Sequence, residues 1–227
     1  MQELHPWNLK PKEAMEIQKK LCDRLILSWD KRDVQTIGGV DVSLKKNRAQ
    51  AAIVIFRFPE LLPIESVTAN VTLEFPYIPG LLSFREGPVV LSAWKKLRIK
   101  PDVLMFDGQG IAHPRGIGIA SHIGLWIGRP TVGVAKSRLY GIHTVPGQNR
   151  GEYAELFDEH NRTRVIGLVL RTRTKVKPVY VSPGHLIDIQ HSLYIILKCC
   201  TKYRLPEPTR WAHRVAGGEP FSELVDN

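Results

Sequence analysis

The sequence predicts an α/β fold in which a mixed central β-sheet is flanked by helices. Its first half contains three consecutive segments rich in β-branched and aromatic residues, which is typical of an antiparallel meander. Its second half contains short, uninterrupted apolar runs, which are typical of buried parallel strands, and segments of helical spacing lie between them. Strands that alternate with helices form a sheet whose faces are covered by those helices.

The first helix is expected over residues 12–29, because apolar side chains recur there at helical spacing opposite a polar face. Paired Gly38 and Gly39 follow in the first strand, where they permit the close approach of another backbone. The predicted meander consists of three strands joined by short turns, at residues 37–43, 50–58 and 66–73.

Residues 76–80 read Pro-Tyr-Ile-Pro-Gly, and two prolines with a glycine fix an exposed turn. A helix is expected after it, with Pro88 in the first turn and Trp94 on the buried face. The remaining predicted elements are strands at 103–106, 131–135, 165–170 and 179–182 and helices at 117–127, 186–200 and about 211–215.

The 227 residues contain no internal repeat and no Gly/Ser-rich linker, so we expect one domain over 1–227 with a flexible tail at 218–227. The longest apolar run, residues 51–56, is far shorter than the roughly 20 residues that cross a bilayer, which excludes a membrane protein. The first ten residues lack the pattern of a secretory signal, and the three cysteines lack metal-type spacing. We therefore expect a cytoplasmic protein, and a monomer, because no apolar stripe is left for a partner.

The charge balance points to a polyanionic partner. Thirty-two Lys and Arg against 22 Asp and Glu give a net charge of +10, with a pI near 9.6. Such a surplus favours nucleic acid as the partner, although a generally solubilising basic surface gives the same sum.

Two aspartates occupy strand positions where a carboxylate is costly. Asp41 lies within an apolar strand between Val40 and Val42, and Asp107 ends a buried strand directly before a glycine-rich loop. Each has a plainer interpretation, because Asp41 could face solvent and Asp107 could cap a turn. The sequence therefore marks both residues as candidates without deciding their roles.

Two carboxylates side by side repel each other unless a cation lies between them. Oxygen ligands without cysteine suit Mg²⁺ or Mn²⁺ rather than zinc. Glu86 lies near the start of the helix after the proline turn, so it could join the cluster or simply interact favourably with the positive end of the helix dipole. His213 could bind the metal, activate water or be structural.

Other residues fit contacts with a nucleic acid. Tyr77 projects from the rigid turn, where it could act as a wedge or stacking surface for a base, or fold back onto the core. Lys136 follows a strand as a point charge suited to a phosphate. His113 and Arg115 lie in the loop after Asp107.

Four motifs in series resemble the Endonuclease V family. They are GGVDVS from Gly38, PYIPGLLSFRE from Pro76, DGQGIAHPRGIGIASHIG from Asp107 and PTVGVAKSRLYG from Pro130. They occur in the family's order, and the resemblance covers most of residues 10–217. It implies an RNase H-like fold and a Mg²⁺-dependent DNA repair endonuclease, with Mn²⁺ as a substitute. Such enzymes recognise deoxyinosine and hydrolyse the second phosphodiester bond 3′ to it, leaving 3′-hydroxyl and 5′-phosphate ends.

By the same resemblance, Asp41, Asp107 and Glu86 would bind the metal, and His213 would support the metal site or the nucleophilic water. Lys136 would assist catalysis by positioning phosphate or substrate. The residues implied to contact DNA, with Tyr77 as the wedge, are Pro76, Tyr77, Ile78, Pro79, Gly80, Leu82, Arg85, Gly108 and His113.

Two other functions stay open at this point. The chain could be an inosine-specific ribonuclease or another RNase H-like metal nuclease, which a contact to a 2′-hydroxyl would favour. It could also be a binding module without chemistry, but acidic residues in a phosphate groove would then weaken binding.

Overall fold

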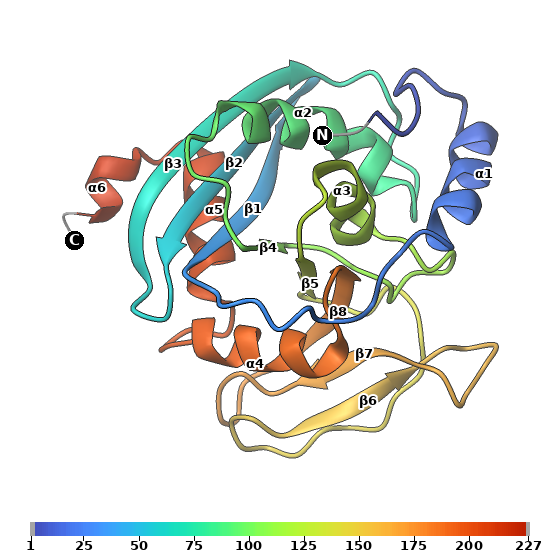
Figure 1. Ribbon diagram of the computed structural model, residues 1–227, viewed down its shortest axis with the longest axis vertical. Coiled ribbons are helices and arrows are strands. Elements are labelled where there is room, and N and C mark those ends of the chain that lie inside the picture. Colours follow the sequence, from blue (N-terminus) through green and yellow to red (C-terminus); the bar gives the residue numbers. More distant parts are fainter. Residues whose placement is uncertain (1–2, 226–227) are drawn as a thin grey trace.

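The computed structural model describes residues 3–225, and its eight strands form one mixed sheet in the order β3-β2-β1-β4-β5-β8-β7-β6 (Figure 1). The strands are β1 (Thr36–Lys45), β2 (Arg48–Arg57), β3 (Leu62–Thr72), β4 (Val103–Phe106), β5 (Thr131–Ala135), β6 (Tyr153–Phe157), β7 (Val165–Leu170) and β8 (Val179–His185). The helices are α1 (Pro11–Cys22), α2 (Leu82–Lys96), α3 (Ile119–Ile127), α4 (Ile189–Cys199), α5 (Glu207–Gly217) and α6 (Phe221–Val225).

The strand pairing confirms the predicted α/β, RNase H-like arrangement. β1, β2 and β3 pair antiparallel, as the meander prediction requires. β4 lies parallel to β1, and β5 lies parallel to β4, so the ends of these three strands meet at one edge of the sheet. β8, β7 and β6 then extend the sheet with antiparallel pairs.

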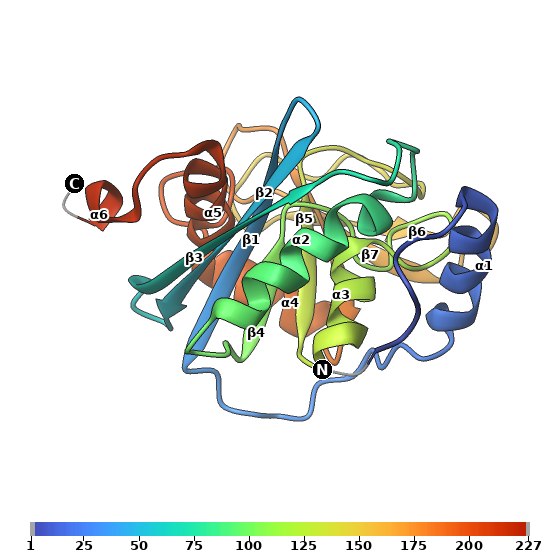
Figure 2. The ribbon, with the colours of Figure 1, turned by 90° about the horizontal axis from the view of Figure 1, so that it is seen from above.

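Helices cover both faces of the sheet, and β2 shows how its residues divide between them. Ile53 and Ile55 pack in the cluster that contains the buried side chains of α2 and α3. Their neighbours Val54 and Phe56 point the other way and pack against α5. Figure 2 shows α2 and α3 on one side of the sheet and α5 on the other.

The first helix ends earlier than its apolar spacing predicts. α1 stops at Cys22, and the predicted helical stretch up to residue 29 is irregular. Ile26 is held there instead by the end of β8, because its N–H donates to His185 and its carbonyl accepts from Leu186. A tertiary contact therefore overrides a local helical pattern.

The second helix begins earlier than predicted. α2 starts at Leu82, directly after the proline turn, so Pro88 lies well inside the helix rather than in its first turn. A proline there leaves the carbonyl four residues back, that of Phe84, without its usual donor. Glu86 consequently lies one turn into α2 and not at its start.

The second half contains elements that the sequence pattern did not predict. The sequence pattern predicts no strand at β6, although the residues of β6 alternate between exposed and buried. α5 begins four residues before the predicted helix. In the predicted tail, α6 packs Leu224 against the α5 face of the sheet. Among the described residues, no helix is long and apolar enough to cross a membrane.

Candidate active site

Parallel pairing of β1 and β4 brings the two predicted aspartates together. Val40 lies opposite Phe106 in the register, and the N–H of Asp107 donates to the carbonyl of Val40 at 3.2 Å. Asp41 and Asp107 each follow one of these paired residues, so their carboxylates lie at the same edge of the sheet. Both side chains are largely buried, 12% and 14% exposed.

Helix α5 brings His213 to the same edge. The helix packs directly on β1, because Gly39 leaves room for the backbone of Pro208. Nδ1 of His213 then lies 2.7 Å from Oδ2 of Asp41. One ligand atom each of Asp41, Asp107 and His213 fall within 4.8 Å of one another, a spacing that a single metal ion could bridge.

Glu86 lies close to this group but is not one of the three. Burial raises its pKa to about 8, and the charges of Asp41 and Asp107 add to the shift. Burial also raises the pKa of Asp41, again with Asp107 contributing, while His213 opposes the shift. These carboxylates are therefore poorly compensated by the protein alone, and a divalent cation would supply the missing charge.

Lys136 provides part of the compensation. It follows the last residue of β5, the strand next to β4, and its Nζ forms an ion pair with Oδ2 of Asp107. Arg204 donates to the carbonyl of Lys136 at 2.7 Å, which fixes the backbone at this strand end. The predicted phosphate-binding cation thus lies beside Asp41, Asp107 and His213, which we call the acidic group.

A cavity of about 320 Å³ opens beside the acidic group. Its walls come from the proline turn and start of α2, from the glycine loop after Asp107, from the segment after β5 and from α1. The lining residues are Gln18, Tyr77, Ile78, Pro79, Gly80, Leu82, Ser83, Asp107, Gly108, Gln109, His113, Gly118, Ile119, Ala135, Lys136, Ser137, Arg138 and Leu139.

All of the residues predicted to contact DNA line this cavity except Pro76 and Arg85. Arg85 donates instead to the carbonyl of Phe75 at 2.7 Å and so braces the proline turn from behind. Tyr77 is 69% exposed at the cavity, which overturns the alternative that it folds back onto the core.

Some lining residues were missed from the sequence. Gln18 lies on the buried face of α1 between Ala14 and Leu21, and a polar residue within an apolar stripe was the available signal. Gln109 is buried with no hydrogen-bond partner for Oε1 among the described residues, while its Nε2 donates to Ser137. Residues 137–139 lie within the motif that begins at Pro130, but the motif gave them no role, and only the fold places them at the cavity.

Comparison with known proteins agrees with this arrangement. The Endonuclease V family model matches residues 19–214. The chain is 48% identical over 210 residues to Endonuclease V of Methanothrix thermoacetophila, covering 92% of each. The crystal structure of Endonuclease V from Streptomyces avermitilis superposes with a TM-score of 0.87 at 38% identity, covering 93% of each chain.

A further structure is that of Ciona intestinalis Endonuclease V in complex with a 24mer DNA containing an inosine followed by a ribo-adenosine. It superposes with a TM-score of 0.79 at 27% identity, covering 95% of this chain and 98% of that one. The long family match and the 48% identical relative together decide the assignment. The chain belongs to the Endonuclease V family and is a nuclease that hydrolyses phosphodiester bonds.

Proposed function

We propose that this protein is a Mg²⁺-dependent repair endonuclease that recognises deoxyinosine in DNA. It hydrolyses the second phosphodiester bond 3′ to the lesion and leaves 3′-hydroxyl and 5′-phosphate ends, with Mn²⁺ able to replace Mg²⁺. The observation that carries this proposal is that Asp107 belongs both to the acidic group and to the cavity wall. A base in the cavity would therefore lie at a fixed distance from the acidic group.

The side chains present fit a hard divalent cation. Asp41 and Asp107 offer carboxylate oxygens, Glu86 lies close by, and among residues 3–225 no cysteine joins the group. When bound, such a cation neutralises charge on the phosphate and makes water more acidic. The imidazole of His213 is bound to Asp41 through Nδ1, so Nε2 is the atom through which it can exchange a proton with water.

Lys136 supplies a second positive charge on the substrate side. It lines the cavity while paired with Asp107, so its Nζ lies where a phosphate could approach both groups. An ammonium at this position would neutralise the developing charge on a phosphate oxygen. We assign Lys136 to phosphate positioning and Asp41, Asp107 and Glu86 to metal binding.

Base recognition requires the lesion to leave the helix. Unstacking costs a few kcal/mol, and less for a mispaired base such as inosine opposite thymine. Tyr77 is exposed on a rigid turn at the cavity mouth, so its ring can occupy the space that the displaced base leaves. The cavity volume of about 320 Å³ is sufficient for one purine base.

A nicking assay on a labelled duplex with one deoxyinosine tests this proposal. The wild-type protein should cut in Mg²⁺ and not in EDTA, and Asp107→Ala should bind the duplex but not cut it. Glu155→Gln, which removes an exposed carboxylate on β6, is the matched control and should cut at the wild-type rate. Full cleavage by Asp107→Ala would remove this residue from the metal site, and cleavage in EDTA would refute the metal dependence.

The same assay should include inosine in RNA. The Ciona intestinalis relative was crystallised with DNA in which a ribonucleotide follows the inosine, so a 2′-hydroxyl at that position is compatible with that protein's fold. A rate on RNA at least tenfold above that on DNA would establish an inosine-specific ribonuclease instead. We further propose that the protein acts in the cytoplasm, in keeping with its three free cysteines. We also propose that it acts as a monomer.

A further inference from the structure

The carbonyl oxygen of Gly80 accepts three side-chain hydrogen bonds at the cavity wall. The donors are Nε2 of Gln18 at 2.9 Å, Nε2 of His113 at 2.9 Å and Nη2 of Arg115 at 2.7 Å. They come from two segments that are far apart in the sequence, α1 and the loop after Asp107. Three donors exceed the two lone pairs of a carbonyl oxygen, so this peptide group is held unusually firmly.

The backbone of the proline turn makes that carbonyl available. Gly80 has a φ of +80°, and the N–H of Leu81 donates to the carbonyl of Ile78 across the turn. A Cβ at Gly80 would lie 2.6 Å from Nη2 of Arg115, so a larger residue would be strained and would also push the donor away. The conformation of the turn and the three hydrogen bonds to the Gly80 carbonyl, which we call the anchor, therefore depend on each other.

The hydrogen bonds also determine which nitrogen of His113 carries the proton. Its Nδ1 accepts from the N–H of Arg115 at 3.1 Å, so the proton of the neutral ring must be on Nε2. Burial lowers the pKa of His113 to about 4, with the charge of Arg115 contributing, which keeps the ring neutral at neutral pH. Nε2–H can then donate to Gly80.

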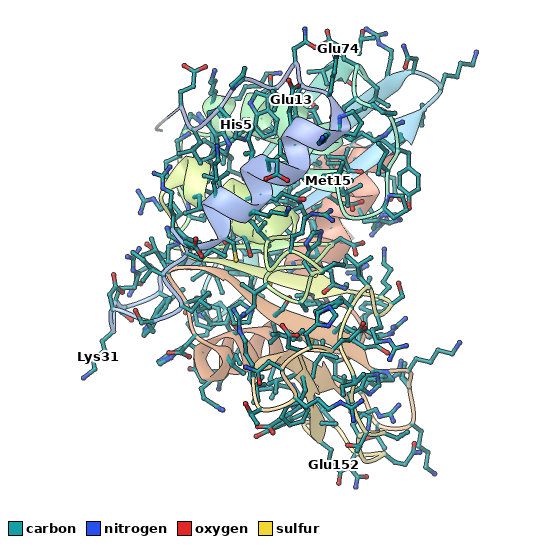
Figure 3. The ribbon with its side chains drawn as sticks, turned by 90° about the vertical axis from the view of Figure 1, so that its right-hand side faces the viewer. His5, Glu13, Met15, Lys31, Glu74 and Glu152 are labelled. Carbon is teal, nitrogen blue, oxygen red and sulfur yellow. The ribbon has the colours of Figure 1, made fainter. Side chains whose placement is uncertain are left out.

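Gln18 connects all parts of this arrangement. Its Oε1 accepts from Nε of Arg115, and its Nε2 donates to the carbonyl of Ile117 as well as to that of Gly80. The side chain is only 1% exposed, and α1 crosses the side of the molecule that faces the viewer in Figure 3. A buried leucine would fill the same volume without desolvating an amide, so packing alone does not account for a glutamine here.

We propose that Gln18 and Arg115 are positioning residues for lesion recognition. By anchoring the Gly80 carbonyl they fix the turn that carries Tyr77 and forms one wall of the cavity. This inference rests on the proposed function, because it assigns the anchor to the selectivity of that same site. Neither residue belongs to the acidic group, so the metal site should work without the anchor.

The test compares Gln18→Leu with a control on the same helix. Binding of an inosine duplex and of the undamaged duplex is measured in EDTA, with 2-aminopurine beside the lesion to report displacement of the base. Gln18→Leu should weaken inosine binding about tenfold, the loss expected for buried hydrogen bonds, and leave undamaged binding within twofold of wild type. Cleavage at saturating enzyme in Mg²⁺ should fall less than threefold.

Leu21→Ala is the matched control, because it removes a buried side chain from α1 without removing a donor to Gly80. An equal loss of inosine selectivity in this variant would overturn the proposal, since it would show that the role of α1 is packing alone. Wild-type selectivity and fluorescence in Gln18→Leu would overturn it as well.

Arg115→Met provides a second variant on a half-buried residue, which should fold even if Gln18→Leu does not. It should lose selectivity, whereas Arg115→Lys should restore part of it through one donor. Unchanged selectivity in Arg115→Met would contradict the anchor. If the wild-type protein itself fails to prefer inosine, the proposed function fails, and this outcome is distinct from a failure of the anchor.

Discussion

At the scale of single residues, the site is built from carboxylates that the protein does not fully neutralise. Asp41 and Glu86 both have raised pKa values, first because of burial and then because other carboxylates are near. Lys136 forms an ion pair with Asp107, and Nδ1 of His213 lies 2.7 Å from Oδ2 of Asp41. The buried negative charges therefore lower the free energy of unfolding at neutral pH, and a divalent cation would reverse this effect. The effect can be measured.

Glu86→Gln tests that effect through stability. The pKa of Glu86 is about 8 in the folded protein against 4.5 for the unperturbed group, so the folded state holds this proton more tightly than the unfolded state. Stability must then decrease as pH rises from about 4.5 to 8. In EDTA at pH 8.5, the free energy of unfolding measured with urea should be about 2 to 4 kcal/mol higher for the variant than for wild type. At pH 4 the two proteins should differ little. If the variant and wild type were equally stable at pH 8.5 as well as at pH 4, Glu86 would not lie in a desolvated acidic site.

Tyr77→Ala tests the wedge. The ring is 69% exposed, so its removal should cost the fold little. Loss of its stacking should reduce discrimination between inosine and undamaged duplex by about ten- to a hundredfold, whereas Mg²⁺ dependence stays unchanged. Tyr77→Phe should keep most of the discrimination because it retains the ring. Unchanged discrimination in Tyr77→Ala would leave the ring without a role in recognition.

The sequence anticipates residues of this site to different degrees. Asp41 and Asp107 are recognisable because a carboxylate interrupts or ends an apolar strand. Glu86, Lys136 and Tyr77 are candidates from their positions, and the resemblance assigns them their roles. Gln18 is marked only as a polar residue within an apolar stripe, and its role cannot be predicted because its partners lie 62 and 97 positions away in the sequence. Only the packing of α1 against the proline turn and the glycine loop reveals this role.

At the scale of elements, the close contact between α5 and β1 positions His213. Gly39→Ala should disrupt it, because the added Cβ would lie 2.0 Å from the backbone of Pro208 and the helix would have to move. We expect a loss of about 3 kcal/mol in stability together with a large loss of cleavage. Gly217→Ala lies at the end of the same helix, where the added Cβ meets no described atom within 4 Å apart from its chain neighbours and the helix's own backbone, so it should change neither quantity. Full activity in Gly39→Ala would show that the placement of His213 is not critical.

The elements themselves follow from local sequence where the pattern is strong. The three meander strands and the buried strands β4, β5 and β7 are predicted, because their apolar runs are decisive. The errors occur where a distant contact takes over, as when His185 and Leu186 hold Ile26 out of the first helix. Pro88 misleads in a similar way, since the start of α2 is determined by the proline turn before it.

At the scale of the whole molecule, the net charge of +10 supports binding to any nucleic acid and does not select the lesion. Affinity for both inosine and undamaged duplexes should fall about a hundredfold between 50 and 200 mM salt, the slope expected for roughly four phosphate contacts. The ratio of the two affinities should stay within threefold, because the cavity is the part that reads the base. A ratio that collapses with salt would mean that selectivity is electrostatic.

The most direct measurement is to map the cut while the lesion is moved along one duplex in single-nucleotide steps. Because Asp107 joins the cavity to the acidic group, the cut should move with the lesion. It should always fall at the second phosphodiester bond on the 3′ side and occur only with a divalent cation. Cuts that stay at one place, scatter along the strand or persist in EDTA would contradict a rigid connection between base recognition and metal-dependent cleavage.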